Sequence, residues 1–309
     1  MTLNPSQKTP AYTAMASTYH KVDTLLAGTT AMRAASTTYL PKHAEESDAN
    51  YQTRLQRSTL VNYYGRALDA AIGHAHKQPV VVKKFPASLS PLLKDIDGAG
   101  NTLDQFSQEE LHNTLHHGIV AFVVDYPTLE GLPEKPTLAD VKRLQARSYV
   151  YSVTAPQFIA AYTLIENGQE RLLHFRFATT EIVPSADFME EATVTKVIAY
   201  EQLVKGGVVT VQTWTDTEQG WITDGPKTLR NVTEMPIVFA YGWKTGTAQG
   251  KPVLGDLADL NVAHWQSLSE QTNILSIARV PFLHAKGSNL NTTTPQTDGT
   301  SVSDAKMVI

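Results

Sequence analysis

Residues 252–281, near the end of the chain, constrain the fold more than any other stretch. Two acidic residues, Asp256 and Asp259, suit the positive end of a helix, and Asp256 is placed to cap its first turn. Arg279 suits the last turn, and Pro281 cannot continue a helix. The pattern predicts one uninterrupted helix of roughly 24 residues, about 36 Å long at about 1.5 Å per residue.

This predicted helix has no clean apolar face. Residues three or four positions apart form a stripe that mixes apolar and polar side chains: Leu254, Leu257, Asn261, His264, Leu268, Gln271 and Leu275. The remaining sides carry mostly polar residues: Asp256, Asp259, Ser267, Glu270 and Asn273. A helix buried in a single globular core has a more continuous apolar stripe. We therefore expect this helix to pack on neighbours along one side and to present a polar, acidic face elsewhere.

Composition places the chain among folded proteins. It has 309 residues, of which 42% are hydrophobic and 18% charged, enough for one large domain or two. A net charge of −4 argues against binding of nucleic acid through many contacts between basic side chains and phosphates. The absence of cysteine excludes disulfides, thiolate metal sites and a cysteine nucleophile. No apolar run is long enough for a membrane helix or a signal peptide, so we expect a soluble intracellular protein.

The first half of the chain alternates helical and extended patterns. Residues 1–20 are rich in Thr, Ser, Ala and Pro and are expected to form a mobile arm. A capping box of Ser107 and Glu110 predicts a helix that stops at Gly118, followed by a strand over 119–124 that is buried on both faces. Further elements are predicted as follows: helices over 21–35, 51–72 and 137–146, and a short strand over 79–82.

Residues 148–250 are predicted to form an antiparallel meander. Two dipeptides, at 167–168 and 206–207, are strong hairpin signals between strand-like runs. The runs are 149–153, 160–165, 171–177, 194–204, 208–214 and 236–240. The long helix and a following strand occupy 251–287. Residues 288–309 are a polar loop, and we expect the natural protein to continue beyond residue 309.

Motifs for chemistry are weak throughout the chain. Asp95 and Asp97 resemble the start of a calcium loop, but Phe106 stands where a chelating carboxylate is needed, which favours a plain turn. His112 and His116 have the spacing of a zinc site but lack the Glu of a His-Glu-x-x-His motif, which favours a structural or surface role. There is no nucleophile elbow, phosphate loop or dinucleotide fingerprint. We therefore predict no enzyme, no catalytic residue, no metal and no cofactor.

Four segments resemble the portal (head–tail connector) proteins of tailed bacteriophages, in particular a group often described only as phage proteins of unknown function. The first is residues 26–33 with Tyr39-Leu40-Pro41, and the second is Tyr51-x-x-Arg54-Leu55-x-Arg57 with Asn62 and Tyr63. The third is residues 118–127. The fourth and most specific runs from Met235-Pro236 through Leu257–Gln266 to residues 281–283. The likeness covers most of residues 21–287, but residues 178–230 carry little of it, and the C-terminal part of the family is missing.

The resemblance implies an α+β subunit of a ring, usually of twelve copies, at one vertex of a capsid. Double-stranded DNA would pass through the ring during packaging and ejection. The implied protein partners are the terminase motor, the major capsid protein and head-completion or tail adaptor proteins. The implied location is the virion, after assembly in the host cytoplasm. On this interpretation, 21–147 is a wing-like α/β region, 148–250 is an antiparallel clip or outer wing, and 251–287 holds a channel-lining stem helix.

Within that helix, the residues expected to face the channel are Asp256, Asp259, Glu270 and Asn273. Two alternatives remain open. One is another structural ring of the head–tail connector, although such adaptors tend to be much shorter. The other is a hydrolase without a readable motif, which would show a deep pocket with convergent groups of shifted pKa.

Overall fold

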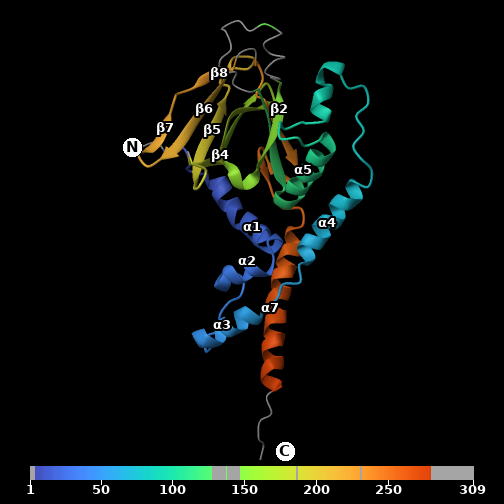
Figure 1. The fold of residues 1–309 in the computed structure, drawn as a ribbon, viewed down its shortest axis with the longest axis vertical. Coiled ribbons are helices and arrows are strands. Elements are labelled where there is room, and N and C mark those ends of the chain that lie inside the picture. The colour runs from blue at the N-terminus through green and yellow to red at the C-terminus, as the bar shows by residue number, and fades with distance from the viewer. Residues whose placement is uncertain (1–3, 127–136, 138–146, 186, 230–231, 280–309) are drawn as a thin grey trace, which may run out of the picture.

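The computed structural model of the chain has antiparallel sheets at one end and a stalk of helices at the other (Figure 1). This is the α+β architecture that the sequence predicts. Helix α7 (Gly255–Ala278) is the axis of the stalk and leads away from the sheets. Helix α1 (Pro10–Leu26) runs from the sheets to the upper part of α7. The structure describes residues 4–126, 137, 147–185, 187–229 and 232–279.

A three-stranded sheet lies at the top of the stalk. Its central strand β1 (Ile119–Asp125) pairs antiparallel with β2 (Tyr149–Thr154) on one side and β9 (Ile237–Tyr241) on the other. The first residues of β1 are fully buried, because α5 (Leu103–His117) packs against this strand as well as the two neighbours. The predicted strand is confirmed, but it is buried on both faces only in its first part, since Val124 is exposed. Helix α5 ends where the sequence places its stop.

The larger sheet is an antiparallel meander of strands in sequence order. The first and last runs of the predicted meander, 149–153 and 236–240, lie in the three-stranded sheet instead, because both pair with β1. At the first hairpin of the larger sheet, Asn167 and Gly168 both have positive φ, 52° and 76°, which a two-residue turn between paired strands requires. The path is β3 (Phe158–Glu166), β4 (Gln169–Pro184), β5 (Glu191–Glu201), β6 (Val209–Thr217) and β7 (Gly220–Thr223), with β8 (Lys227–Leu229) also on β6. A small hairpin, β10 (Lys244–Gly246) and β11 (Gln249–Gly250), precedes α7.

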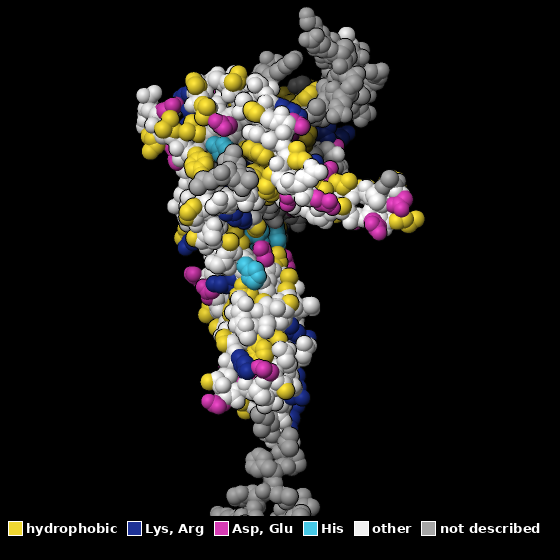
Figure 2. All heavy atoms as spheres, turned by 90° about the vertical axis from the view of Figure 1, so that its left-hand side faces the viewer, with side chains coloured by type: hydrophobic (Ala, Val, Ile, Leu, Met, Phe, Trp, Pro, Cys, Tyr) yellow, Lys and Arg dark blue, Asp and Glu magenta, His cyan; other side chains and the backbone are white. Residues whose placement is uncertain are grey.

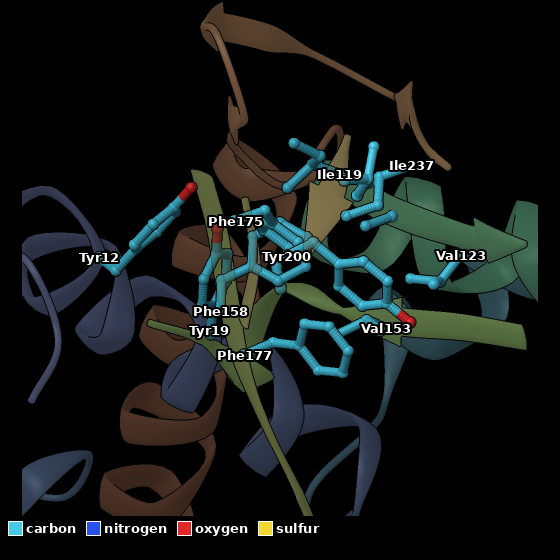
Figure 3. Close-up of a cluster of buried hydrophobic side chains, with 13 residues drawn as sticks. Tyr12, Tyr19, Ile119, Val123, Val153, Phe158, Phe175, Phe177, Tyr200 and Ile237 are labelled. Carbon is cyan, nitrogen blue, oxygen red and sulfur yellow. The ribbon is translucent and has the colours of Figure 1, made fainter. Parts of the chain in front are cut away.

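An aromatic core joins the two sheets (Figure 3). Phe175 of the meander packs edge-to-face on Phe158 and on Phe239 of β9, with ring centroids 5.0 and 5.2 Å apart. Tyr12 of α1 adds a third edge-to-face contact to Phe158, and its hydroxyl donates to the carbonyl of Ala248 at 2.8 Å. Such ring pairs stabilise a core beyond the area they bury.

The N-terminal segment is not the mobile arm that its composition predicts. Residues 10–20 form the first part of α1, because Tyr12 and Tyr19 bury their rings in the aromatic core. The predicted helix over 21–35 is also divided, at Gly28. The remaining helices are α2 (Thr29–Ala34), α3 (Asp48–Arg57) and α4 (Tyr63–Ala75), with short 3-10 turns at Ser36–Thr38, Ala87–Leu93 and Ala155–Gln157.

Three other predicted elements are corrected. The helix over 51–72 is two helices, because Asn62 turns the chain and its side chain accepts from the amide of Gly65 at 2.8 Å. Helix α5 is capped by Thr102 and Gln105 rather than by the predicted Ser107 box. Residues 79–82 form no strand. The helix predicted over 137–146 lies outside the described residues, except for its first position.

The joint between the sheets and the stalk depends on Gly118. Its φ of 82° ends α5 in a left-handed conformation. A Cβ at this position would lie 1.9 Å from the carbonyl oxygen of Lys251, in the segment that leads into α7. The Gly118 carbonyl also accepts from the amide of Gly242 at 2.9 Å. Backbones from three parts of the chain therefore meet where only glycine fits.

Helix α7 has the predicted length of 24 residues and is buried along one narrow line. That line is Ala258, Asn261, Trp265 and Ser269. Trp265 is fully buried among apolar side chains from α1, α3 and α4. The predicted stripe is therefore misplaced around the helix: it shares only Asn261 with the buried line, it omits Trp265, and its last members, Gln271 and Leu275, are exposed. Asp256 lies inside the first turn rather than at its cap, because the helix begins one residue earlier.

Asn261 and Ser269 in the buried line have partners on α4 and on the segment that connects α3 to α4. The Asn261 side chain accepts from the amide of Tyr64 and donates to the carbonyl of Val61, both at 2.9 Å. Ser58 donates its hydroxyl to that of Ser269 at 2.7 Å. A buried polar group costs little when its hydrogen bonds are made. These bonds explain why the stripe on α7 is interrupted by polar residues.

Trp265 should therefore dominate the packing of the stalk. We expect Trp265→Ala to lower the free energy of unfolding by about 3–5 kcal/mol, because a large buried side chain leaves a cavity. Leu260→Ala, on the exposed side of the same helix, should change it by about 0.5 kcal/mol at most. Urea unfolding followed by circular dichroism measures both. Equal effects of the two substitutions would contradict this packing.

Below α2, an ion pair fixes the chain ahead of α3. Arg54 donates to both carboxylate oxygens of Glu46, at 2.9 and 2.7 Å, and to the carbonyl of Pro41 at 2.9 Å. The two side chains are only 2% and 9% exposed. The hydrogen bonds from Arg54 lower the pKa of Glu46 to about 2. A bidentate, enclosed pair of this kind is stronger than a surface salt bridge.

This pair makes a prediction about acid stability. Because the pKa of Glu46 is lower in the folded state, its stabilisation is complete above about pH 4.3 and is lost as the pH falls toward 2. We expect Glu46→Gln to cost about 1.5–3 kcal/mol at pH 7, and the difference from the parent to shrink toward pH 2. Glu45→Gln, on the exposed neighbour, is the control. A difference that stays constant with pH would rule out this role.

Candidate functional site on the long helix

The side of α7 opposite the buried line is exposed along its length. Asp259 and Glu270 are eleven positions apart, about three turns, and so share one side of this helix with the nearby Asp256. The rest of the open face carries apolar side chains. Those of Leu260, Ile274 and Leu275 are 67%, 63% and 54% exposed. The acidic face predicted from sequence exists, but a substantial apolar component accompanies it.

Asp256 and Asp259 lie at the upper end of α7, beside α1. Asp259 forms an ion pair with Lys21 of α1, so its charge is locally compensated. Both carboxylates line a cleft of about 190 Å³ together with Lys21 and Lys251. The ammonium of Lys251 lies 4.2 Å above the ring of Trp243, a cation–π contact. The predicted acidic site at this end is therefore a mixed-charge surface.

Glu270 and Asn273 lie lower on the helix. The side chain of Glu270 is exposed, and Asn273 is half-buried. The pKa of Arg54 is raised mainly by its hydrogen bond to Glu46, and the charge of Glu270 adds to this effect. Glu270 therefore lies near enough to α3 to act on a buried cation while facing solvent. That Asp256, Asp259, Glu270 and Asn273 line a channel remains a prediction.

A cleft of about 490 Å³ lies between α4 and α5. Its lining includes Asp69, Gln105, Glu109 and His112. Burial lowers the pKa of His112, and the nearby charge of His116 adds to the effect. The described lining contains no serine, threonine, cysteine or lysine, so it offers no nucleophile paired with a base of the kind a serine- or cysteine-type hydrolase needs.

The histidines that share a partner at the C-terminal end of α5 are His116 and His117, not the pair His112 and His116 whose spacing the sequence singles out. Asp23 of α1 places one carboxylate oxygen 2.8 Å from Nε2 of His116 and 2.9 Å from Nε2 of His117. Burial alone would raise the pKa of Asp23, but the hydrogen bonds and charges of the two imidazoles hold it well below its usual range. The Tyr64 hydroxyl lies 2.9 Å from Nδ1 of His116. The pair His112 and His116 contributes only a ring contact, with centroids 5.7 Å apart.

This Asp–His–His cluster had little signal in the sequence. Asp23 precedes the histidines by more than ninety residues, and no spacing rule connects them. Two adjacent histidines at the end of a helix were the only local indication. They share Asp23 as a partner because α1 crosses α5 at this point.

Comparison with known families adds one finding. Residues 252–307 match a family described as Domain of unknown function (DUF4055). The match begins just before α7 and includes all of it. No curated protein matches the chain. Among the described helices, none combines the length and hydrophobicity of a membrane span. The matched region thus contains the helix on which the sequence analysis also centred.

Proposed function

We propose that this chain is a subunit of a bacteriophage portal ring, through which double-stranded DNA is packaged and ejected. In this proposal α7 is the stem helix, with one side on its own subunit and the open side toward the channel and a neighbouring copy. The ring would dock the terminase motor, and later the head-completion and tail adaptor proteins, at the capsid vertex of the virion. It would have no catalytic residue of its own.

The observation that carries the proposal is the open side of α7. A helix of 24 residues packs on its own chain along one side, while Leu260, Ile274 and Leu275 stay in solvent. Apolar side chains repeated along an exposed helix are typical of a surface that another protein covers. A head-to-tail contact between identical subunits, closed by rotation, generates a ring and covers different faces of each copy.

The distribution of charged side chains along the stalk supports a channel through which DNA can move. Figure 2 shows interspersed acidic and basic side chains on the side of the stalk where α1 to α3 lie, and α7 itself carries Asp256, Asp259 and Glu270 but no lysine or arginine. The chain as a whole carries a net charge of −4. Strong contacts to phosphate would retain DNA and make its passage sensitive to salt. A channel surface with few free cations permits movement instead.

The meander would then meet protein partners. Phe188 and Met189, at the tip of the hairpin between β4 and β5, are 82% and 83% exposed. Unpaired strand edges and exposed apolar tips are sites at which other chains add. This supports a clip or outer-wing role for residues 148–250, in contact with neighbouring subunits, motor or adaptor rather than DNA.

Ring assembly provides the first test. We expect the purified chain to form particles with a mass near twelve times that of one chain. Ile274→Glu should shift these particles to smaller species, because it places a charge in an apolar contact between subunits. Gln108→Glu adds the same charge at an exposed position of α5, away from this side of α7, and should preserve the particles. Mass photometry with native mass spectrometry measures the distribution.

Two outcomes would oppose the proposal. One is that the purified chain stays monomeric at every concentration and salt condition tried, and that intact virus particles contain no ring of it. The other is a ring that survives Ile274→Glu, which would place the contact between subunits on another side of α7.

Glu270 tests the channel role. If it faces DNA, Glu270→Lys should leave assembly intact, strengthen DNA retention and slow translocation. The dependence of log binding constant on log salt should steepen by about 0.9 for each additional phosphate that the protein neutralises. Glu270→Gln removes the charge without reversing it and should have a smaller effect. Filter binding at several salt concentrations and a packaging assay give these values.

The same variants separate the alternative role. If Glu270 is a partner between subunits, Glu270→Lys should weaken the ring itself. Rings that assemble normally and retain DNA as the parent does would contradict the channel role. Circular dichroism of Glu270→Lys controls for a loss of folding caused by the new charge near Arg54.

A further inference from the structure

The cluster of Asp23, His116 and His117 brings three metal-ligating groups to one point. Two imidazole Nε2 atoms and one carboxylate oxygen all lie within 4.8 Å of one another. The shortest separations are 2.8 and 2.9 Å. A tetrahedral zinc ion with bonds of about 2.0–2.1 Å holds its ligand atoms about 3.3 Å apart. The two carboxylate–imidazole separations, 2.8 and 2.9 Å, are slightly shorter than this value, so the carboxylate would have to move slightly away from the imidazoles to admit an ion.

We propose that Asp23, His116 and His117 bind a divalent transition-metal ion of the zinc class at the junction of α1 and α5. Two imidazoles and a carboxylate form a ligand set suited to Zn²⁺, Co²⁺ or Ni²⁺. Mg²⁺ and Ca²⁺ prefer sites made of oxygen alone. Water completes the coordination from the side of Asp23, whose side chain is 46% exposed and provides access from solvent.

Tyr64 supplies the outer support that such sites use. When Nε2 of His116 binds a metal, its Nδ1 carries the proton and needs an acceptor. The Tyr64 hydroxyl is 2.9 Å from that Nδ1 and can donate its own proton to the His116 carbonyl, 3.4 Å away. A buried tyrosine therefore holds the imidazole in place and can accept from it in the tautomer that metal binding requires.

For His117, metal binding costs no hydrogen bond at the second nitrogen. Its Nδ1 is buried and has no partner among the described residues. Without a metal, Nε2 carries the proton and donates to Asp23, and Nδ1 is an acceptor without a partner. With a metal bound to Nε2, the proton is on Nδ1, which is then a donor without a partner. The number of unsatisfied atoms is the same in both states.

The position in the helix favours a cation. His116 and His117 are the last two residues of α5, before the left-handed Gly118. The C-terminal end of a helix carries partial negative charge and stabilises positive charge beside it. A bound ion would tie α1 to α5 directly beside the joint between the sheets and the stalk.

The test uses the full chain, freed of any histidine tag and treated with a chelator. Isothermal titration with ZnCl₂ should show one ion per chain, and CoCl₂ should produce a visible d–d absorption that Zn²⁺ removes. MgCl₂ should not compete. Removing a ligand with His117→Gln or Asp23→Asn should weaken binding by at least about 10- to 100-fold. Tyr64→Phe, which keeps the ring, should weaken it by about the same range.

Matched controls separate this site from adventitious binding to surface histidines. His74→Ala and His76→Ala, at the end of α4, should leave affinity unchanged. Absence of zinc binding at millimolar concentration, or unchanged affinity in His117→Gln and Asp23→Asn, would overturn the proposal. If those variants do not fold, X-ray absorption of the zinc-loaded parent decides. Two imidazole nitrogens with oxygen ligands support the site, and any other shell rejects it.

Discussion

The structure depends on how α7 is held along one narrow line. Trp265 fills the space between α1, α3 and α4, while Asn261 and Ser269 make hydrogen bonds above and below it. Apolar burial provides the free energy, and the polar bonds fix the rotation of α7 about its axis, because each is satisfied in only one orientation. With that rotation fixed, Leu260 and Ile274 are directed to solvent. The face offered to other molecules is therefore a consequence of the internal packing.

A second constraint is the joint above the stalk. Gly118 allows α5 and the segment before α7 to approach closely, and the Asp23 carboxylate connects α1 to the end of α5 at the same level. The aromatic core then continues from α1 into both sheets, through Tyr12 and Phe158. Sheets and stalk are thus coupled through packed, hydrogen-bonded contacts rather than a single flexible connection. In a ring, this coupling would transmit movement between the partner-facing sheets and the stem.

Signals that act over a few residues allowed much of this fold to be predicted. The length of α7, the buried strand β1 and the turn at Asn167 and Gly168 follow from local caps, apolar runs and turn residues. Features decided by distant partners were missed. Asp23 meets His116 only because two helices cross, and the rotation of α7 depends on hydrogen bonds to α4 and its preceding loop. Tyr12 and Tyr19, about two turns apart, were the overlooked sign of a helix in a Thr- and Ser-rich segment.

The central claim is that the open side of α7 is covered by another copy of this chain around a channel. Single-particle electron microscopy of the purified protein tests it most directly. The account predicts a closed ring with a central hole, in which α7 lies next to the hole and Leu260, Ile274 and Leu275 are buried between subunits. A discrete monomer, or an assembly without a hole in which these three side chains remain in solvent, would contradict it.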